Sequence, residues 1–200
     1  MLTGLRPETF QNLQLNAGVF LLNFDYSAIN DKAALEDAVL AALESGEGVL
    51  GATIGGGNFN CTPSMRTIEA DGMRYPFVGS TVNDMWTVEL STTLKEVTPE
   101  NFALALASAD VTQNGGKTIV SVRTDIKATD YQPKLCWVGD LSDGRFVLIE
   151  LDNALNTAGA NFVFSDKSEG TIPVTFRGHV SDLKSQGNAP CRVIFFDEAA

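Results

Sequence analysis

Residues 46–81 show neither a sustained helical period nor a sustained strand period, although both flanking segments are regular. Residues 30–44 have the spacing of an amphipathic helix, and residues 86–94 alternate as a strand. Irregular segments longer than about 12–15 residues are uncommon in compact domains and are usually functional or disordered. This one is too apolar for a solvated linker, because it contains Ile54, Phe59, Met65, Ile68 and Tyr75 among other apolar residues. We therefore predict an extended arm over residues 46–81 that meets another subunit.

The regular parts of the sequence predict a mainly β domain. Strands are predicted over residues 18–24, 86–94, 118–126, 134–139, 145–151, 162–165, 171–180 and 191–196. Residues 152–160 are predicted to be a loop. Two short helices are predicted, one behind a cap at Asn30 or Asp31 and one behind Thr98-Pro99. We expect a single domain over residues 1–200: an antiparallel β-sandwich or barrel-like fold with one or two short flanking helices and a long extended loop.

The alternation also assigns faces to the strands. Trp86, Val88, Leu90, Thr92 and Leu94 share one face, and the residues between them, from Thr87 to Thr93, share a polar face. In residues 118–126 we expect Val120, Val122 and Ile126 to point inward. Pro173 cannot donate a ladder hydrogen bond, so its strand is predicted to lie at a sheet edge or to begin near this proline.

Charge and cysteine content limit the partners. The chain has 25 acidic and 14 basic residues, a net charge of −11, which disfavours neutralising nucleic-acid phosphates over a large surface. The excess of acidic residues suits a channel wall that repels phosphates. It suits equally an acidic surface that keeps a protein in solution. Neither a signal peptide nor a membrane span is recognisable, so we expect cytoplasmic synthesis and free thiols at Cys61, Cys136 and Cys191, the last two in the core.

No catalytic, cofactor or metal motif is found. Gly55-Gly56-Gly57 is not followed by the Gly-Lys-Ser/Thr of a phosphate loop, and His179, the one histidine, has no nucleophile motif beside it. We expect no enzyme, no cofactor and no metal site. The aromatic residues Trp86, Trp137, Tyr75 and Tyr131 would suit a carbohydrate-binding module if exposed, but both tryptophans fall within strand patterns, which predicts core packing.

The order of several segments resembles a known family. LGATIGGGNF at residues 50–59 runs into TPSMRTIEADG at residues 62–72, and the strand over residues 86–94 leads into EVTPEN at residues 96–101. A late alternating strand over residues 170–180 is followed by a closing strand at residues 193–196. These segments, taken together in this order, are similar to the major tail tube proteins of long-tailed bacteriophages and prophages.

The resemblance implies a structural virion protein that is not an enzyme. Its hexameric rings would stack into the hollow tail tube, assembled in the bacterial cytoplasm, with the tape-measure, tail-terminator and baseplate proteins as partners and DNA passing through without specific binding. The arm would contact a neighbouring subunit through Ile54, Phe59, Met65, Arg66, Ile68, Arg74 and Tyr75. Arg66 and Arg74 could pair with Glu69 or Asp71 of another subunit, or locally. The tube of a contractile or secretion-type injection machine, or a virion carbohydrate-binding module, stays open as an alternative.

Overall fold

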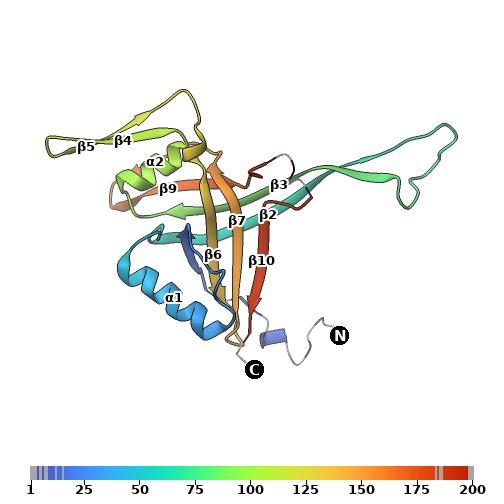
Figure 1. Ribbon diagram of the computed structural model, residues 1–200, viewed down its shortest axis with the longest axis horizontal. Helices are drawn as coiled ribbons and strands as arrows, with labels where there is room; N and C mark the ends of the chain where they lie inside the picture. The colour runs from blue at the N-terminus through green and yellow to red at the C-terminus, as the bar shows by residue number, and fades with distance from the viewer. Residues whose placement is uncertain are drawn as a thin grey trace.

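The computed structural model describes residues 4, 6, 9–11, 13–14, 16–182, 184 and 187–197. It confirms the predicted class, because the chain is mainly antiparallel β-structure with two α-helices (Figure 1). The first sheet has the order β1 (Val19–Leu22), β6 (Gln132–Asp140), β7 (Phe146–Asn156) and β10 (Cys191–Phe196). The second contains β9 (Ser168–Arg177), β3 (Thr81–Leu94) and β2 (Thr53–Thr67), with β8 (Val163–Ser165) paired to β9. The remaining elements are the β4 (Ala109–Asn114) and β5 (Lys117–Val122) hairpin, α1 (Lys32–Ser45), α2 (Pro99–Leu106), and the 3-10 turns Thr9–Gln11 and Ala128–Asp130.

The two sheets are joined along both sides of the sandwich. On one side β7 belongs to both, because its last residues Leu155 and Asn156 pair with β9. On the other side the chain after α1 runs along β1 and then enters β2: Leu22 N donates to Gly48 O at 2.6 Å, and Leu50 N donates to Phe20 O at 3.1 Å. The result is the sandwich with barrel-like closure that the sequence predicts.

The first sheet is covered on both faces, which produces two apolar cores. Between the sheets, Phe20, Leu135 and Leu151 of the first sheet meet Leu90, Val174 and Phe176 of the second. On the opposite face, Leu21, Cys136 and Leu148 pack against Leu35 of α1. Neighbouring residues of one strand therefore enter different cores, as the side-chain alternation of a strand requires.

Both helices begin as predicted. Asp31 caps α1 and accepts a hydrogen bond from Ala34 N at 2.9 Å, and Gly46 ends the helix with φ of 71°, a conformation that glycine adopts without strain. Thr98 caps α2 and accepts from Asn101 N at 3.1 Å, with Pro99 in the first turn. Asn101 is buried, and its side-chain amide donates to Leu50 O and Glu96 O, which fixes α2 against the entry to β2.

Three expectations about secondary structure and strand order are wrong. Residues 53–67 are not a loop but the strand β2; its period is hidden by irregularities of register between Thr53 and Gly57 and between Ser64 and Met65, and by exposure of both faces. The strand β7 continues through Asn156, so most of the predicted loop over residues 152–160 is sheet. Pro173 lies in β9, which has sheet partners on both sides and is not an edge strand. On the side that faces β7 and β8, however, Pro173 falls between the residues paired with β8 and those paired with β7, so no ladder hydrogen bond is required from it there.

A charged cluster crosses β6, β7 and β10 on the face that α1 covers. Glu150 is completely buried, with Arg192 Nη2 at 3.0 Å and Lys134 Nζ at 3.6 Å from its carboxylate oxygens. Asp152 lies beside it on the same face of β7 and 3.8 Å from Arg192. Burial, followed by a hydrogen bond to Glu150, raises the pKa of Asp152 above its ordinary value of 3.8.

This raised pKa predicts a pH-dependent gain from Asp152→Asn. Above pH 3.8 the unfolded chain releases the Asp152 proton before the folded chain does, so this group lowers the free energy of unfolding as pH rises through the interval between the two pKa values. We expect Asp152→Asn to raise the urea midpoint relative to the wild type at pH 7 and to have little effect at pH 3.5. Asp37→Asn on α1 is the charge-matched control, and an equal gain from it would show that net charge alone is responsible.

Candidate assembly surfaces

The β2–β3 hairpin has a buried base and a free outer part. Its strands pair from Thr53 with Leu94 out to Thr67 with Thr81, whereas β9 pairs with β3 only between Glu89 and Leu94. We call residues 64–86 the distal arm, because there β2 and β3 have only each other as sheet partners within the described chain. Figure 1 shows this distal arm extending well beyond the rest of the molecule.

The distal arm exposes large apolar side chains. Tyr75 is 79% exposed, Phe77 69% and Met65 59%, and these residues occupy the end of the hairpin and the strand leading to it. Further exposed apolar residues of the arm are Ile68, Val78, Met85 and Trp86. None of these residues belongs to either core in the part of the chain that the structure describes. Contiguous exposed apolar surface of this kind marks an interaction site in most soluble proteins.

The seven residues predicted to form the arm contact fall into two groups. Ile54, Met65, Ile68 and Tyr75 are exposed, as is Arg74 at the end of the hairpin. Arg66 is exposed and pairs locally with Asp84 at 2.9 Å across the hairpin, one of the two arrangements left open by the sequence. Phe59 instead packs against the core between the sheets, so it anchors the base of the hairpin to its own domain.

The predicted core position of one aromatic residue is wrong. Trp86 continues the pattern of Val88, Leu90 and Leu94, but it lies one step beyond the body and is 46% exposed, which contradicts the predicted core position. Trp137 packs against the core as predicted, and its Nε1 donates to Ala17 O at 2.8 Å. The alternation identifies the face of a strand but not the point where the covering layer ends.

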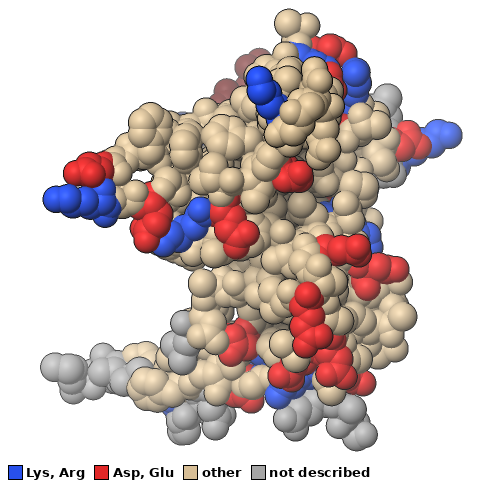
Figure 2. Space-filling view, turned by 90° about the vertical axis from the view of Figure 1, so that its left-hand side faces the viewer, with Lys and Arg blue, Asp and Glu red and all other residues tan. Residues whose placement is uncertain are grey.

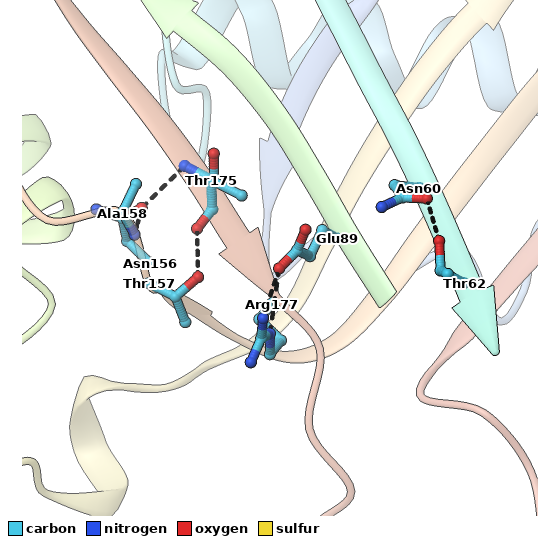
Figure 3. Close-up of polar contacts among 8 residues, drawn as sticks. All are labelled: Asn60, Thr62, Glu89, Asn156, Thr157, Ala158, Thr175 and Arg177. Carbon is cyan, nitrogen blue, oxygen red and sulfur yellow. Dashed lines mark hydrogen bonds and ion pairs between the residues drawn. The ribbon is translucent and has the colours of Figure 1, made fainter. Parts of the chain in front are cut away.

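The outward side of the second sheet is a polar face. It is built from short hydroxyl and amide side chains on β2, β3 and β9, together with one ion pair (Figure 3). Thr62 Oγ1 donates to Asn60 Oδ1 at 2.7 Å on β2, while Arg177 Nη2 of β9 lies 2.8 Å from Glu89 Oε1 of β3. The face comprises Asn58, Asn60, Thr62, Thr87, Glu89, Ser91, Thr93, Thr175 and Arg177.

The basic groups on or beside this polar face are matched by carboxylates. Arg177 donates to Glu89 through Nε as well, at 3.2 Å, and Lys95 Nζ lies 3.6 Å from Glu169 at the end of the sheet. Paired cations attract phosphates less than free ones, because the neighbouring carboxylate cancels most of their field. The polar face therefore offers hydrogen-bonding groups with little net charge.

Asn156 holds the place where the two sheets meet, and nothing in the sequence indicates this role. It is buried, and its Oδ1 accepts from Thr175 N at 2.9 Å and from Ala158 N at 3.4 Å (Figure 3). Its amide group donates to Ala105 O of α2. One side chain thus connects the end of β7, the strand β9 and the helix α2.

The β4–β5 hairpin forms a second projection. It extends away from the body on the side opposite the distal arm (Figure 1). Val111 pairs with Val120, and Ala109 pairs with Val122, so these four share one face of the hairpin. Val122 is 65% exposed and Ile126 55%, which contradicts their predicted inward orientation. The pattern predicts an apolar face correctly, but no element among the described residues covers it fully.

Acidic side chains collect on the side that carries α1. Figure 2 shows them gathered in the lower half of this view, the half to which α1 belongs. Glu36, Asp37 and Glu44 are exposed on the helix, with Glu47 just beyond it. The negative net charge is therefore spread unevenly, with a concentration on the helix and an almost balanced polar face on the second sheet.

A hollow of about 780 Å³ lies beside the later part of β7 and the start of β10, and it is lined by His179, the one histidine of the sequence. His179 is half-buried; its Nδ1 is 3.2 Å from Asn153 O, and its ring meets Tyr131 edge-on. Cys191 lines the same hollow, where burial and the neighbouring Cys61 raise its pKa to about 11. A thiol with so high a pKa is a poor nucleophile at neutral pH.

Within the described residues, no group of three or more His, Cys, Asp and Glu side chains is arranged to hold a metal ion. None of the described helices has the length and apolar character needed to cross a membrane. No protein-family model matches the chain, and no curated protein matches it.

Because only the base of the β2–β3 hairpin packs in the core, we predict that the end of the distal arm can be shortened without loss of the fold. Thr67 and Thr81 face each other, so residues 68–80 can be replaced by Asn-Gly, which forms a tight two-residue turn. We expect the melting temperature of this variant, measured by circular dichroism, to stay within about 4 °C of wild type, because roughly 1 kcal/mol or less is lost. Loss of cooperative unfolding would instead make the end of the arm part of the folded core.

Proposed function

We propose that this protein is a structural tube subunit of the long-tailed bacteriophage type. Six copies would form a ring, and stacked rings would build the hollow tail of a virion. The observation that carries the proposal is the distal arm, which projects from a stable base and exposes Tyr75, Phe77 and Met65. An isolated monomer gains nothing from such an arm, whereas a neighbouring subunit would bury its apolar surface.

The sheet edges support ring formation. The strand β2 lies at the end of its sheet, so its outer edge carries backbone groups without a strand partner over its length in the described chain. Long free edges favour pairing with another chain, and proteins that remain monomeric usually block them. A neighbouring copy that approaches this edge would extend the second sheet around a ring.

The polar face is the best candidate for the channel wall. If the second sheets of neighbouring copies are joined, their polar faces form one continuous surface, lined by hydroxyl and amide groups and paired charges such as Glu89 with Arg177. DNA and a tape-measure protein would pass such a wall without stable contacts, since it presents few unpaired cations to phosphates. The acidic side with α1 would then lie away from the channel.

The two projections support stacking. The distal arm and the β4–β5 hairpin extend in opposite directions, so one copy has different contact surfaces at its two sides (Figure 1). Contacts between unlike surfaces do not terminate in a dimer; they generate rings or open-ended assemblies. Tail-terminator and baseplate proteins would occupy the last free surfaces at the ends of the tube. A tube from a contractile or secretion-type machine would use the same surfaces and, in addition, bind a sheath.

A carbohydrate-binding module of a virion is the second candidate, favoured by the exposure of Trp86 and Tyr75. Sugars stack on exposed aromatic rings, and such a module would not need a polymerising edge. A tube subunit assembles into rings, whereas a carbohydrate-binding module binds glycans without polymerising. Measuring assembly and glycan binding on the same samples therefore distinguishes the two candidates.

The proposal predicts that the purified chain forms rings or tubes with a central channel at high concentration. Negative-stain electron microscopy and light scattering are the measurements. We expect the variant in which residues 68–80 are replaced by Asn-Gly to remain folded but to lose stacking, because it lacks Tyr75 and Phe77. Leu43→Ser on the exposed surface of α1 is the matched control and should assemble normally.

Two results would contradict the proposal. Monomers at all concentrations, with or without a tape-measure protein, would exclude a tube, and glycan binding that is lost in Trp86→Ala would support the carbohydrate candidate instead. If the shortened variant forms tubes equally well, the tube proposal stands, but the end of the arm is not part of the stacking contact.

A further inference from the structure

Two of the three cysteines lie at the same corner of the sandwich, although they are far apart in sequence. Cys61 is in β2 and pairs with Val88 of β3; Cys191 begins β10 and pairs with Leu151 of β7. Cys61 is on the same side of β2 as Phe59, which faces the core between the sheets, and Cys191 packs against that same core. Both thiols therefore point into one layer, from opposite sheets.

Contacts around Gly178 hold the two strands together at this corner. Gly178 N donates to Val88 O at 3.0 Å, which places the residue after β9 directly beside the partner of Cys61. A Cβ on Gly178 would lie 2.7 Å from the Leu151 side chain and 2.9 Å from Pro190 O, so a side chain has no room there. Because Leu151 pairs with Cys191 and Pro190 precedes it, the start of β10 lies beside Gly178, which itself contacts β3.

The two thiols are close enough to influence each other electrostatically. After burial, the neighbouring Cys61 is the main cause that raises the pKa of Cys191. Cys61 is exposed and Cys191 partly buried, whereas Cys136 is fully buried in the other core, against α1. One accessible thiol next to a second, less accessible thiol is the arrangement of an attacking and a resolving cysteine.

We propose that Cys61 and Cys191 form a redox-responsive pair that is converted to an intramolecular disulfide by small-molecule disulfides. The exposed Cys61 thiolate attacks a sulfur of the oxidant, which makes a mixed disulfide and releases one thiolate of the oxidant. The Cys191 thiolate then attacks the Cys61 sulfur and releases the second. The protein loses two protons and two electrons, and the oxidant is reduced to two thiols.

The bond would connect the two sheets at the base of the β2–β3 hairpin. In the reduced protein this corner is held by packing and by single hydrogen bonds such as that from Gly178 to Val88. A covalent link between β2 and β10 would limit separation of the sheets there and restrict the unfolded chain between residues 61 and 191. The inference does not depend on the tube proposal, because it concerns contacts within one chain.

The second step makes the reaction sensitive to pH. Burial and the Cys61 neighbour raise the pKa of Cys191 to about 11, so its thiolate fraction at neutral pH is small and grows about tenfold per pH unit. We expect the rate of disulfide formation to rise more steeply from pH 7 to pH 9 than the rate at which the mixed disulfide forms on Cys61. A mixed disulfide on Cys61 should accumulate transiently at pH 7.

The test uses the full, reduced protein incubated with oxidised glutathione under native conditions. Intact mass spectrometry should record the loss of two hydrogen atoms, and peptide mapping without reduction should recover a peptide pair linked through Cys61 and Cys191. Cys136→Ser is the matched control and should behave like the wild type. Cys61→Ser should stay unmodified, and Cys191→Ser should stop at the mixed disulfide.

The proposal would be overturned by any of three results. The wild type could end as a stable mixed disulfide at Cys61, it could form only intermolecular dimers on non-reducing gels, or the mapped bond could contain Cys136. Each result shows that Cys61 and Cys191 do not approach closely enough in the folded chain, and none of them bears on whether the protein forms tubes.

Discussion

The covering of the first sheet on both faces is the constraint on which the rest of the structure depends. Leu135 and Cys136 are neighbours on β6, and both are completely buried, one between the sheets and one under α1. Both faces of this sheet are largely covered, and its exposed large apolar side chains on β10, Val193 and Phe195, lie at the sheet edge. Interaction surface remains on the outward polar face of the second sheet, on the hairpins and at the sheet edges, which is why the candidate surfaces all lie there.

The sandwich also depends on polar groups placed at its joints. Asn156 connects β7, β9 and α2, and Asn101 connects α2 with the chain entering β2. Buried amides of this kind cost free energy unless their hydrogen bonds are made, so they favour one arrangement of the elements over others. The buried Glu150 is different, because it places a charged group in the interior while its partners Arg192 and Lys134 are partly exposed.

The β2–β3 hairpin links this rigid body to the proposed assembly. Leu90 and Leu94 fix its base in the core, whereas the apolar residues from Met65 to Trp86 have no core to enter. A rigid base makes the position of the outer part predictable for a neighbour, which reduces the entropy lost on binding. The same base carries the Cys61–Cys191 corner, so a covalent link there would act at the point from which the arm projects.

The sequence by itself determined the class of fold, the two helices with caps at Thr98 and at Asn30 or Asp31, and most strands, because these depend on local periodicity and short-range hydrogen bonds. It also located the unusual segment, since the apolar content around Met65 and Tyr75 exceeds what a solvated loop contains. Only the tertiary structure decided that residues 53–67 of this segment are a strand, that Trp86 and Val122 are exposed, and that Cys61 and Cys191 lie at the same corner of the sandwich. These features depend on where a covering layer ends and on which distant strands adjoin, and local alternation contains neither kind of information.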